Sequence, residues 1–175
     1  MRIAISGKSG CGNTTVSQLV SEALEYPMIN FTFRTLAEEK HIEFWEFCKL
    51  AETSDEYDLE VDRRQVEMAR SFDNCVLGSR LAIWMLKEAD LKVYLTASIE
   101  ERANRVLKRE GGDFEERMRQ TDMRDKNDSA RYKRLYQIDN SDASIADLVI
   151  DTSDKDPQSV AQIIVNEAKR RISAL

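Results

Sequence analysis

The sequence is poor in the residues that cross-link secreted domains or interrupt folded chains. Its 175 residues include three cysteines, two prolines, six glycines and one histidine. The cysteines, Cys11, Cys48 and Cys75, are odd in number and far apart, which argues against a disulfide framework and a zinc site. The scarcity of proline leaves no Pro-rich linker. We therefore expect residues 1–175 to form a single domain.

Long hydrophobic runs and an excess of positive charge are also lacking. No apolar stretch approaches the roughly 20 residues of a membrane-spanning helix, and residues 1–7 lack the apolar region of a signal peptide. Lys and Arg number 26 against 32 Asp and Glu, a net charge of −6. An acidic chain binds nucleic acids and anionic lipids poorly. We expect a cytoplasmic monomer that binds small molecules, with no nucleic acid polymer or membrane as a partner.

Short apolar runs alternate with longer segments of helical periodicity. Strands are predicted at 2–6, 28–29, 75–77, 91–95 and 148–150, and helices at 16–24, 43–51, 61–69, 99–109, 114–136 and 159–172. This alternation is typical of a three-layer α/β fold with a parallel sheet. In such folds ligands bind beyond the carboxyl ends of the strands.

A glycine-rich loop follows the first predicted strand. Such a loop, between a strand and a helix, directs backbone N–H groups at a phosphate. The pattern G-x-x-x-x-G-K-[ST] is matched by Gly7, Gly12 and Thr14 but departs from it at Asn13. We predict a Mg²⁺ ligand in the Thr14 hydroxyl. The predicted ATP-binding residues are Gly7, Lys8, Ser9, Gly10, Cys11, Gly12, Asn13, Thr14 and Thr15.

The asparagine at position 13 removes the lysine that normally contacts the β- and γ-phosphates. Lys8 lies in the same loop, and we hypothesise that its ammonium group folds back over the phosphates and replaces that lysine. Cys11 precedes a predicted helix, a position that lowers a thiol pKa, although filling space is the simpler role for it.

Arginines recur downstream in positions that favour an anionic substrate. Residues 100–136 carry a net charge of +2, whereas the remainder of the chain carries −8. Each arginine alone is more typical of a surface ion pair, but together with a phosphate loop they favour a nucleotide site. They follow predicted strands (Arg34, Arg80) or share the faces of predicted helices (Arg102, Arg105 and Arg109; Arg124 and Arg131, with Asp128).

With these motifs the sequence resembles the cytidylate kinases, and the compact archaeal-type branch more than the bacterial one. The resemblance covers nearly the whole chain and rests on segments 7–15, 62–65, 80–85, 89–93, 98–105, 124–132 and 147–153. It implies a P-loop core with a five-stranded parallel sheet, a nucleoside-monophosphate (NMP) region at about 31–72 and a lid at about 105–131. It also implies Mg²⁺-dependent transfer of the γ-phosphoryl group of ATP to CMP or dCMP.

The resemblance also implies roles for individual residues. Arg34, Arg80 and Arg131 would bind the acceptor phosphate, and Arg124 and Asp128 the acceptor sugar and neighbouring groups. The catalytic residues would be Lys8 together with Arg105 and Arg109 of the lid.

The sequence departs from the family at further places. Gly78 stands where an acidic residue is usual, and segment 29–34 is shorter than the family's usual serine- and glycine-containing segment before its arginine. Leu81 stands where the bacterial branch has an acidic residue that reads the base. Two alternatives therefore stay open: a regulatory nucleotide-binding module with little turnover, and a kinase for another small acceptor.

Overall fold

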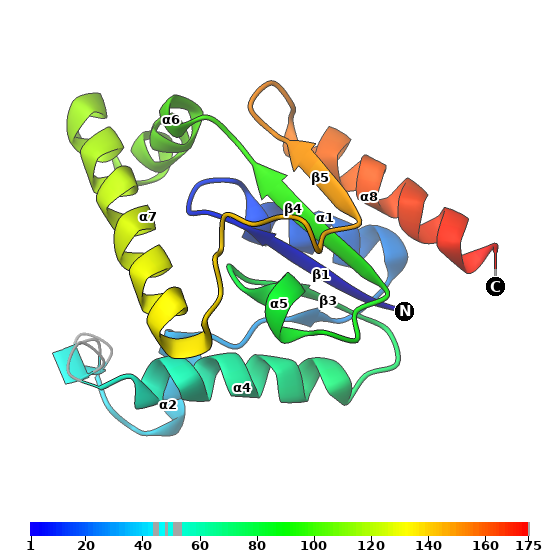
Figure 1. The fold of residues 1–175 in the computed structure, drawn as a ribbon, viewed down its shortest axis with the longest axis horizontal. Coiled ribbons are helices and arrows are strands. Elements are labelled where there is room, and N and C mark those ends of the chain that lie inside the picture. The colour runs from blue at the N-terminus through cyan, green and yellow to red at the C-terminus, as the bar shows by residue number, and fades with distance from the viewer. Residues whose placement is uncertain (44–45, 48, 51–53, 175) are drawn as a thin grey trace.

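Five parallel strands form one sheet in the order β2-β3-β1-β4-β5 (Figure 1). The structure is a computed structural model that describes residues 1–43, 46, 47, 49, 50 and 54–174. The strands are β1 (Arg2–Gly7), β2 (Met28–Ile29), β3 (Cys75–Gly78), β4 (Leu91–Thr96) and β5 (Leu148–Asp151). The prediction of a three-layer α/β fold with a five-stranded parallel sheet is confirmed.

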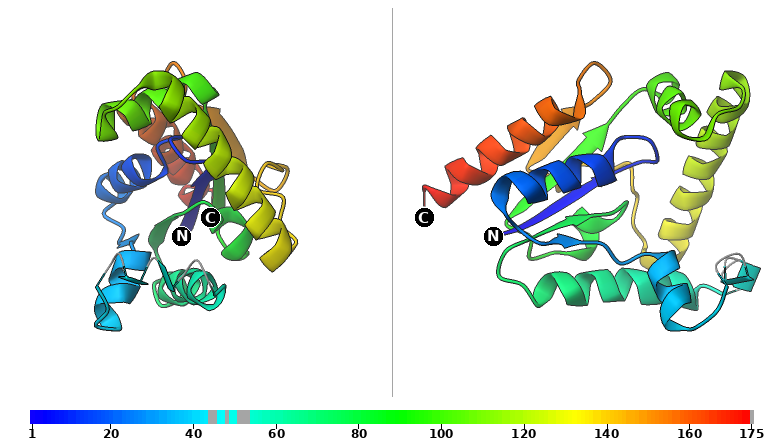
Figure 2. Two further views of the ribbon diagram at one scale, coloured as in Figure 1. Left: turned by 90° about the vertical axis from the view of Figure 1, so that its left-hand side faces the viewer. Right: turned by 180° about the vertical axis from the view of Figure 1, so that it is seen from behind.

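Helices cover both faces of the sheet, because successive β1 side chains point to opposite faces. Ile3 and Ile5 pack with one pair of helices, whereas Ala4 packs against the other side. On the first face lie α1 (Asn13–Leu24) and α8 (Pro157–Ile172); on the second lie α4 (Glu56–Arg70) and α5 (Ala82–Met85). Figure 2 shows the two helical layers with the sheet between them.

A smaller apolar cluster lies apart from the two main core layers. Phe31, Leu36 and Phe47 are buried in it against Val61 of α4. It holds the short helix α2 (Phe33–Glu39), where the Thr32 side chain accepts a hydrogen bond from the Thr35 backbone. This cluster falls within the predicted NMP region.

Two further helices lie beyond the carboxyl end of β4. They are α6 (Ile99–Glu110) and α7 (Phe114–Tyr136), which pack against each other and are joined through Gly111 and Gly112. Both glycines have positive φ, which lets the chain reverse direction sharply between the helices. The predicted lid therefore spans the end of α6, this turn and most of α7.

The sequence pattern located most elements to within a few residues and missed two short ones. Helices α2 and α5 were not predicted, because four to seven residues are too few to display a helical period. Part of the helix predicted at 43–51 lies outside the described residues, as does Cys48. Cys11 and Cys75 are both buried and free.

The carboxyl ends of the parallel strands lie along one edge of the sheet. The glycine-rich loop follows β1, Arg80 follows β3, and Thr152 follows β5. Within the described part of the chain, no helix combines the length and the apolar character that crossing a bilayer requires.

Candidate active site

A cleft of about 620 Å³ opens at the carboxyl edge of the sheet. Its walls come from the glycine-rich loop, the turn after β3, helices α6 and α7, and the segment after β5. The charged side chains in its lining are Lys8, Arg80, Glu101, Arg105, Lys108, Arg109, Arg124 and Lys155. Seven of these eight are basic, which suits a highly charged anionic ligand.

The glycine-rich loop forms a compact turn at the floor of the cleft. The Cys11 N–H donates to the Lys8 carbonyl over 3.1 Å, and Gly12 begins α1 with φ of +97°. Gly10 has φ of +82°, and a Cβ there would lie 2.9 Å from the Arg102 Cβ. Only glycine combines this conformation with such a close helix. Helix α6 thus packs directly against the loop.

Asn13 closes the loop on itself. Its Nδ2 donates to the Gly7 carbonyl over 2.6 Å, and its Oδ1 is buried without a partner among the described residues. The amide carries no charge and is engaged at the base of the loop. Lys8 lines the cleft from the same loop and forms no ion pair with a described carboxylate. Lys8 is therefore the one charged side chain of the loop, and no described carboxylate engages it.

A buried ion pair supports the loop from behind. The Nη1 atom of Arg102 donates to Asp125 of α7 over 2.7 Å and to the Ser9 carbonyl over 3.1 Å. The Arg102 and Asp125 side chains are only 7% and 11% exposed. Helical spacing placed Arg102 on the same face as Arg105 and Arg109, and no signal in the sequence identified its buried partner.

Arg105 is held between two backbone segments of the cleft wall. Its Nη2 donates to the Thr152 carbonyl over 2.6 Å, and its Nη1 donates to the Gly10 carbonyl and the Thr152 hydroxyl. Arg105 therefore contacts the glycine-rich loop through Gly10. Arg109 lies one turn further along α6, where it pairs with Glu110 at the surface.

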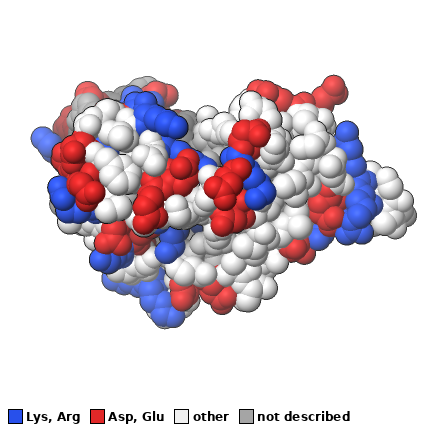
Figure 3. Space-filling view, turned by 90° about the horizontal axis from the view of Figure 1, so that it is seen from above, with Lys and Arg blue, Asp and Glu red and all other residues white. Residues whose placement is uncertain are grey.

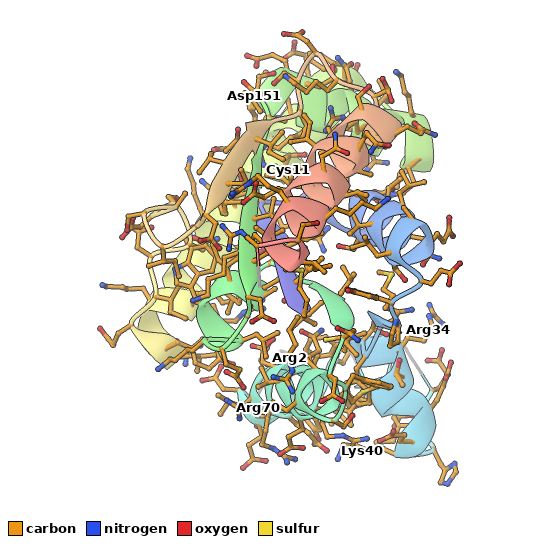
Figure 4. All side chains as sticks on the ribbon, turned by 90° about the vertical axis from the view of Figure 1, so that its right-hand side faces the viewer. Arg2, Cys11, Arg34, Lys40, Arg70 and Asp151 are labelled. Carbon is orange, nitrogen blue, oxygen red and sulfur yellow. The ribbon has the colours of Figure 1, made fainter. Side chains whose placement is uncertain are left out.

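The expectation of a lowered thiol pKa at Cys11 is wrong. Burial raises the pKa of Cys11, and this effect is larger than the lowering caused by the nearby Arg102. The side chain is 2% exposed and packs in the core formed by β1, α1 and α8, beside the sheet in Figure 4. Desolvation of the thiolate raises this pKa by more than the helix N-terminus lowers it. Cys11 therefore serves as a packing residue.

Two arginines, Arg80 and Arg124, lie close together in the cleft. The pKa of Arg124 is lowered by burial and by its neighbour Arg80, which together outweigh Asp128. Arg80 pairs with Asp128 over 2.8 Å. Crowded guanidinium groups at the end of a cleft favour the binding of an anion, which removes their mutual repulsion.

We expect Arg124→Met to raise the KM for a phosphorylated acceptor about 10- to 100-fold, the equivalent of one or two charge-assisted hydrogen bonds. Thermal stability should be unchanged or higher, because the repulsion from Arg80 is removed. The control is Arg134→Met on the same helix, where an exposed guanidinium pairs with Asp55. An unchanged KM in Arg124→Met would remove this residue from the site.

A line of ion pairs leads from the cleft toward α4. Asp128 accepts from Arg80 on one side and from Arg131 over 3.1 Å on the other. Arg131 reaches Asp58 of α4 over 3.5 Å. The structure therefore brings together Arg80, Asp128 and Arg131, whereas the pattern had placed Asp128 between Arg124 and Arg131. Arg34 is exposed in the first turn of α2, near the edge of the molecule, and does not line the cleft (Figure 4).

Gly78 has no room for the acidic side chain that the resemblance led us to expect at this position. A Cβ there would overlap Ser17 of α1, with only 2.7 Å to the Ser17 Cβ. Helix α1 therefore packs against the end of β3 at the place where a carboxylate would project. The hydroxyls of Thr14 and Ser79 remain as oxygen ligands in the cleft. This set fits a Mg²⁺ ion held mainly by nucleotide phosphates and water.

We expect Gly78→Ala to lower the free energy of unfolding by about 1–3 kcal/mol, the usual cost of overpacking. Urea denaturation measures this loss. The double variant Ser17→Ala/Gly78→Ala should regain part of it, because the hydroxyl that overlaps the new methyl group is gone. Wild-type stability in Gly78→Ala would show that α1 can move away.

Charges of both signs lie on the outer surface near the site. On the face viewed from above, acidic and basic side chains are interspersed (Figure 3). The lining of the cleft, in contrast, is mainly basic. This distribution suits a small anionic ligand better than a polyanion.

Comparisons with known proteins identify the family of the chain. The model of the cytidylate kinase-like family matches residues 2–154. Cytidylate kinase 2 of Borreliella burgdorferi is 45% identical, covering 98% of this chain and 97% of that protein. The cytidylate kinase of Pyrococcus horikoshii is 44% identical, covering 93% and 85%. A shikimate kinase structure from Bacteroides thetaiotaomicron shares the fold, with a TM-score of 0.62, 15% identity, and coverage of 99% and 98%. The chain belongs to the cytidylate kinase-like family.

Proposed function

We propose that this protein transfers the γ-phosphoryl group of ATP to CMP or dCMP and releases ADP with CDP or dCDP. Membership of the family and the names of its relatives support this activity. The observation that carries it in the structure is the basic cleft between the glycine-rich loop and Arg80–Arg124. One end suits a triphosphate and the other a monophosphate.

The donor end of the cleft is residues 7–15. Backbone N–H groups of the loop and the start of α1 bind the phosphates, and Lys8 supplies the charge that Asn13 does not. Thr14 would hold Mg²⁺ through its hydroxyl. When bound, that ion neutralises charge on the β- and γ-phosphates.

The acceptor end is assigned to the line of ion pairs that begins at Arg80. Arg80 and Arg124 line the cleft and bind the acceptor phosphate. Arg131 is neutralised by two carboxylates, so we place it with Asp128 beside the nucleoside. Arg34 stays a prediction for the same phosphate, which it could reach only if α2 moves toward the cleft.

Catalysis rests on positioning and on stabilisation of charge, with no covalent intermediate. Lys8 and Arg109 approach the transferring group, and Arg105 holds the loop and the β5–α8 segment together. The lid at about 105–131, which includes the Gly111–Gly112 turn, closes over both nucleotides and excludes water. The NMP region at 31–72 moves toward it. One chain supplies both ends of the cleft, which is consistent with our proposal that the protein acts as a monomer.

The activity is tested with purified protein, ATP and Mg²⁺ and with CMP, dCMP, UMP and AMP as acceptors, by separating the products chromatographically. We expect CDP and dCDP to form fastest. Loss of turnover on addition of EDTA, and its recovery on addition of Mg²⁺, would support a requirement for this ion.

Tight binding of ATP and CMP without turnover would instead favour a regulatory module. This alternative rests on the absence of the usual lysine at position 13, where the chain has an uncharged asparagine.

A further inference from the structure

Helix α4 carries two carboxylates, Asp58 and Asp62, that contact side chains of α7. Asp58 and Asp62 are one turn apart and share a face of α4. Asp58 pairs with Arg131, and Asp62 accepts a hydrogen bond from the Tyr136 hydroxyl over 2.6 Å. The carboxyl end of α7 thus rests on the first half of α4 (Figure 1).

The position of Asp62 relative to the cleft follows from the ion-pair line. Arg80 lines the cleft, Asp128 bridges it to Arg131, and Arg131 reaches the α4 face that carries Asp62. For Asp62 to contact the base, the nucleoside of a monophosphate held by Arg80 and Arg124 must extend along this line toward α4, beyond the residues that line the cleft. In that orientation the base lies at the end of the line that is nearest to Asp62.

Asp62 has hydrogen-bonding capacity to spare at that end. Tyr136 occupies Oδ2, and within the described residues Oδ1 has no hydrogen-bond donor. The Nε of Arg131 is buried and has no acceptor among the described residues. The pair therefore offers one spare acceptor beside one spare donor. Burial raises the pKa of Asp62 to about 6, so that the carboxylate is still mainly ionised at neutral pH.

Cytosine and uracil differ at the edge that such a pair would read. Cytosine presents an amino donor at C4 and an acceptor at N3, whereas uracil presents the reverse. A carboxylate accepts from the cytosine amino group and repels the uracil carbonyl oxygen. Leu81, which follows Arg80, is 2% exposed and apolar, so that position cannot do this.

We propose that Asp62 determines the base specificity of this enzyme by accepting a hydrogen bond from the 4-amino group of the acceptor cytosine, oriented by Tyr136. This assignment rests on the proposed cytidylate kinase activity. Asp62 is a specificity residue that contacts the base and takes no part in phosphoryl transfer.

The test compares kcat/KM for CMP and UMP in the wild type and in Asp62→Asn. The amide keeps an oxygen for Tyr136 and turns an N–H₂ donor toward the base. We expect kcat/KM for CMP to fall at least tenfold and that for UMP to rise, which shifts the CMP/UMP ratio about 10- to 100-fold. The matched control is Glu67→Gln on α4, where an exposed carboxylate pairs with Arg63; its ratio should not change.

Three further outcomes are decisive. A folded Asp62→Asn enzyme with the wild-type CMP/UMP ratio overturns the inference and leaves the proposed activity intact. Equal losses for both acceptors, matched by Tyr136→Phe, would make Asp62 a structural link between α4 and α7 and also overturn it. If the wild-type protein phosphorylates no acceptor, both the proposed function and this inference are wrong.

A second readout guards against misfolding of the variant. Asp62→Ser keeps a small polar side chain, and an analogue of CMP that lacks the 4-amino group replaces the natural acceptor. Wild-type enzyme should lose at least tenfold in kcat/KM on this analogue, whereas Asp62→Ser should treat it and CMP alike. A tenfold preference retained by Asp62→Ser would show that another group reads the amino group.

Discussion

Asp125→Ala is expected to lower the free energy of unfolding by about 3–5 kcal/mol, the cost of leaving a buried charge without its partner. Arg102 is then enclosed between α6, α7 and the glycine-rich loop, with only the Ser9 carbonyl as an acceptor among the contacts observed. A protein of this size is stabilised by only about 5–15 kcal/mol in total. Chemical denaturation should therefore show a large shift of the midpoint.

The same helix offers a matched control. Asp122 lies one turn earlier and pairs with Lys126, and both side chains are more than half exposed. Asp122→Ala should cost about 0–1 kcal/mol, since exposed pairs contribute little. Equal losses at positions 122 and 125 would contradict the view that burial makes the difference.

A double variant separates the stability of the buried pair from its role in the site. Replacing both partners, Arg102→Met with Asp125→Leu, should restore most of the stability, because no buried charge is left unpaired. The loop would still lack the hydrogen bond from Arg102 to Ser9. We expect weaker ATP binding in a protein of near-normal stability.

The core and the donor loop could be predicted from the sequence because their signals are local. Predicted strands of three to five residues identified β1, β3, β4 and β5, and the spacing of Gly7, Gly12 and Thr14 identified the loop. Side chains of adjacent residues on a buried strand, such as Ile3 and Ala4, face different layers, so apolar residues at both positions predicted a sheet covered on both faces.

The partners of the charged residues could not be predicted, because they depend on contacts distant in sequence. Arg102 and Asp125 are 23 residues apart, and Asp62 and Tyr136 are 74 apart. Helical spacing shows which residues share a face but not what that face meets. The same limit explains the wrong prediction for the Cys11 pKa. The helix N-terminus that lowers it is evident in the sequence, whereas the burial that raises it is not.

Lys8→Ala is expected to reduce kcat about a thousandfold or more, which amounts to the loss of measurable turnover. The basis is the arrangement of charge around the donor loop. Asn13 is neutral and bound to Gly7, Arg105 is held by two carbonyls, and Arg109 is paired with Glu110. Lys8 is the loop side chain that can follow the γ-phosphate during transfer. Steady-state assays with ATP and CMP measure the effect.

A change in the position of the charge tests the mechanism more sharply than its removal. In Lys8→Ala/Asn13→Lys the cation returns to the position where P-loop kinases carry it, so we expect much of the turnover to return. Lys169→Ala, an exposed lysine in the last turn of α8, should have full activity. If Lys8→Ala alone keeps wild-type kcat, the charge comes from the arginines of the cleft and Lys8 has no catalytic role. If the double variant stays inactive while still binding ATP, the site needs its cation to approach from position 8.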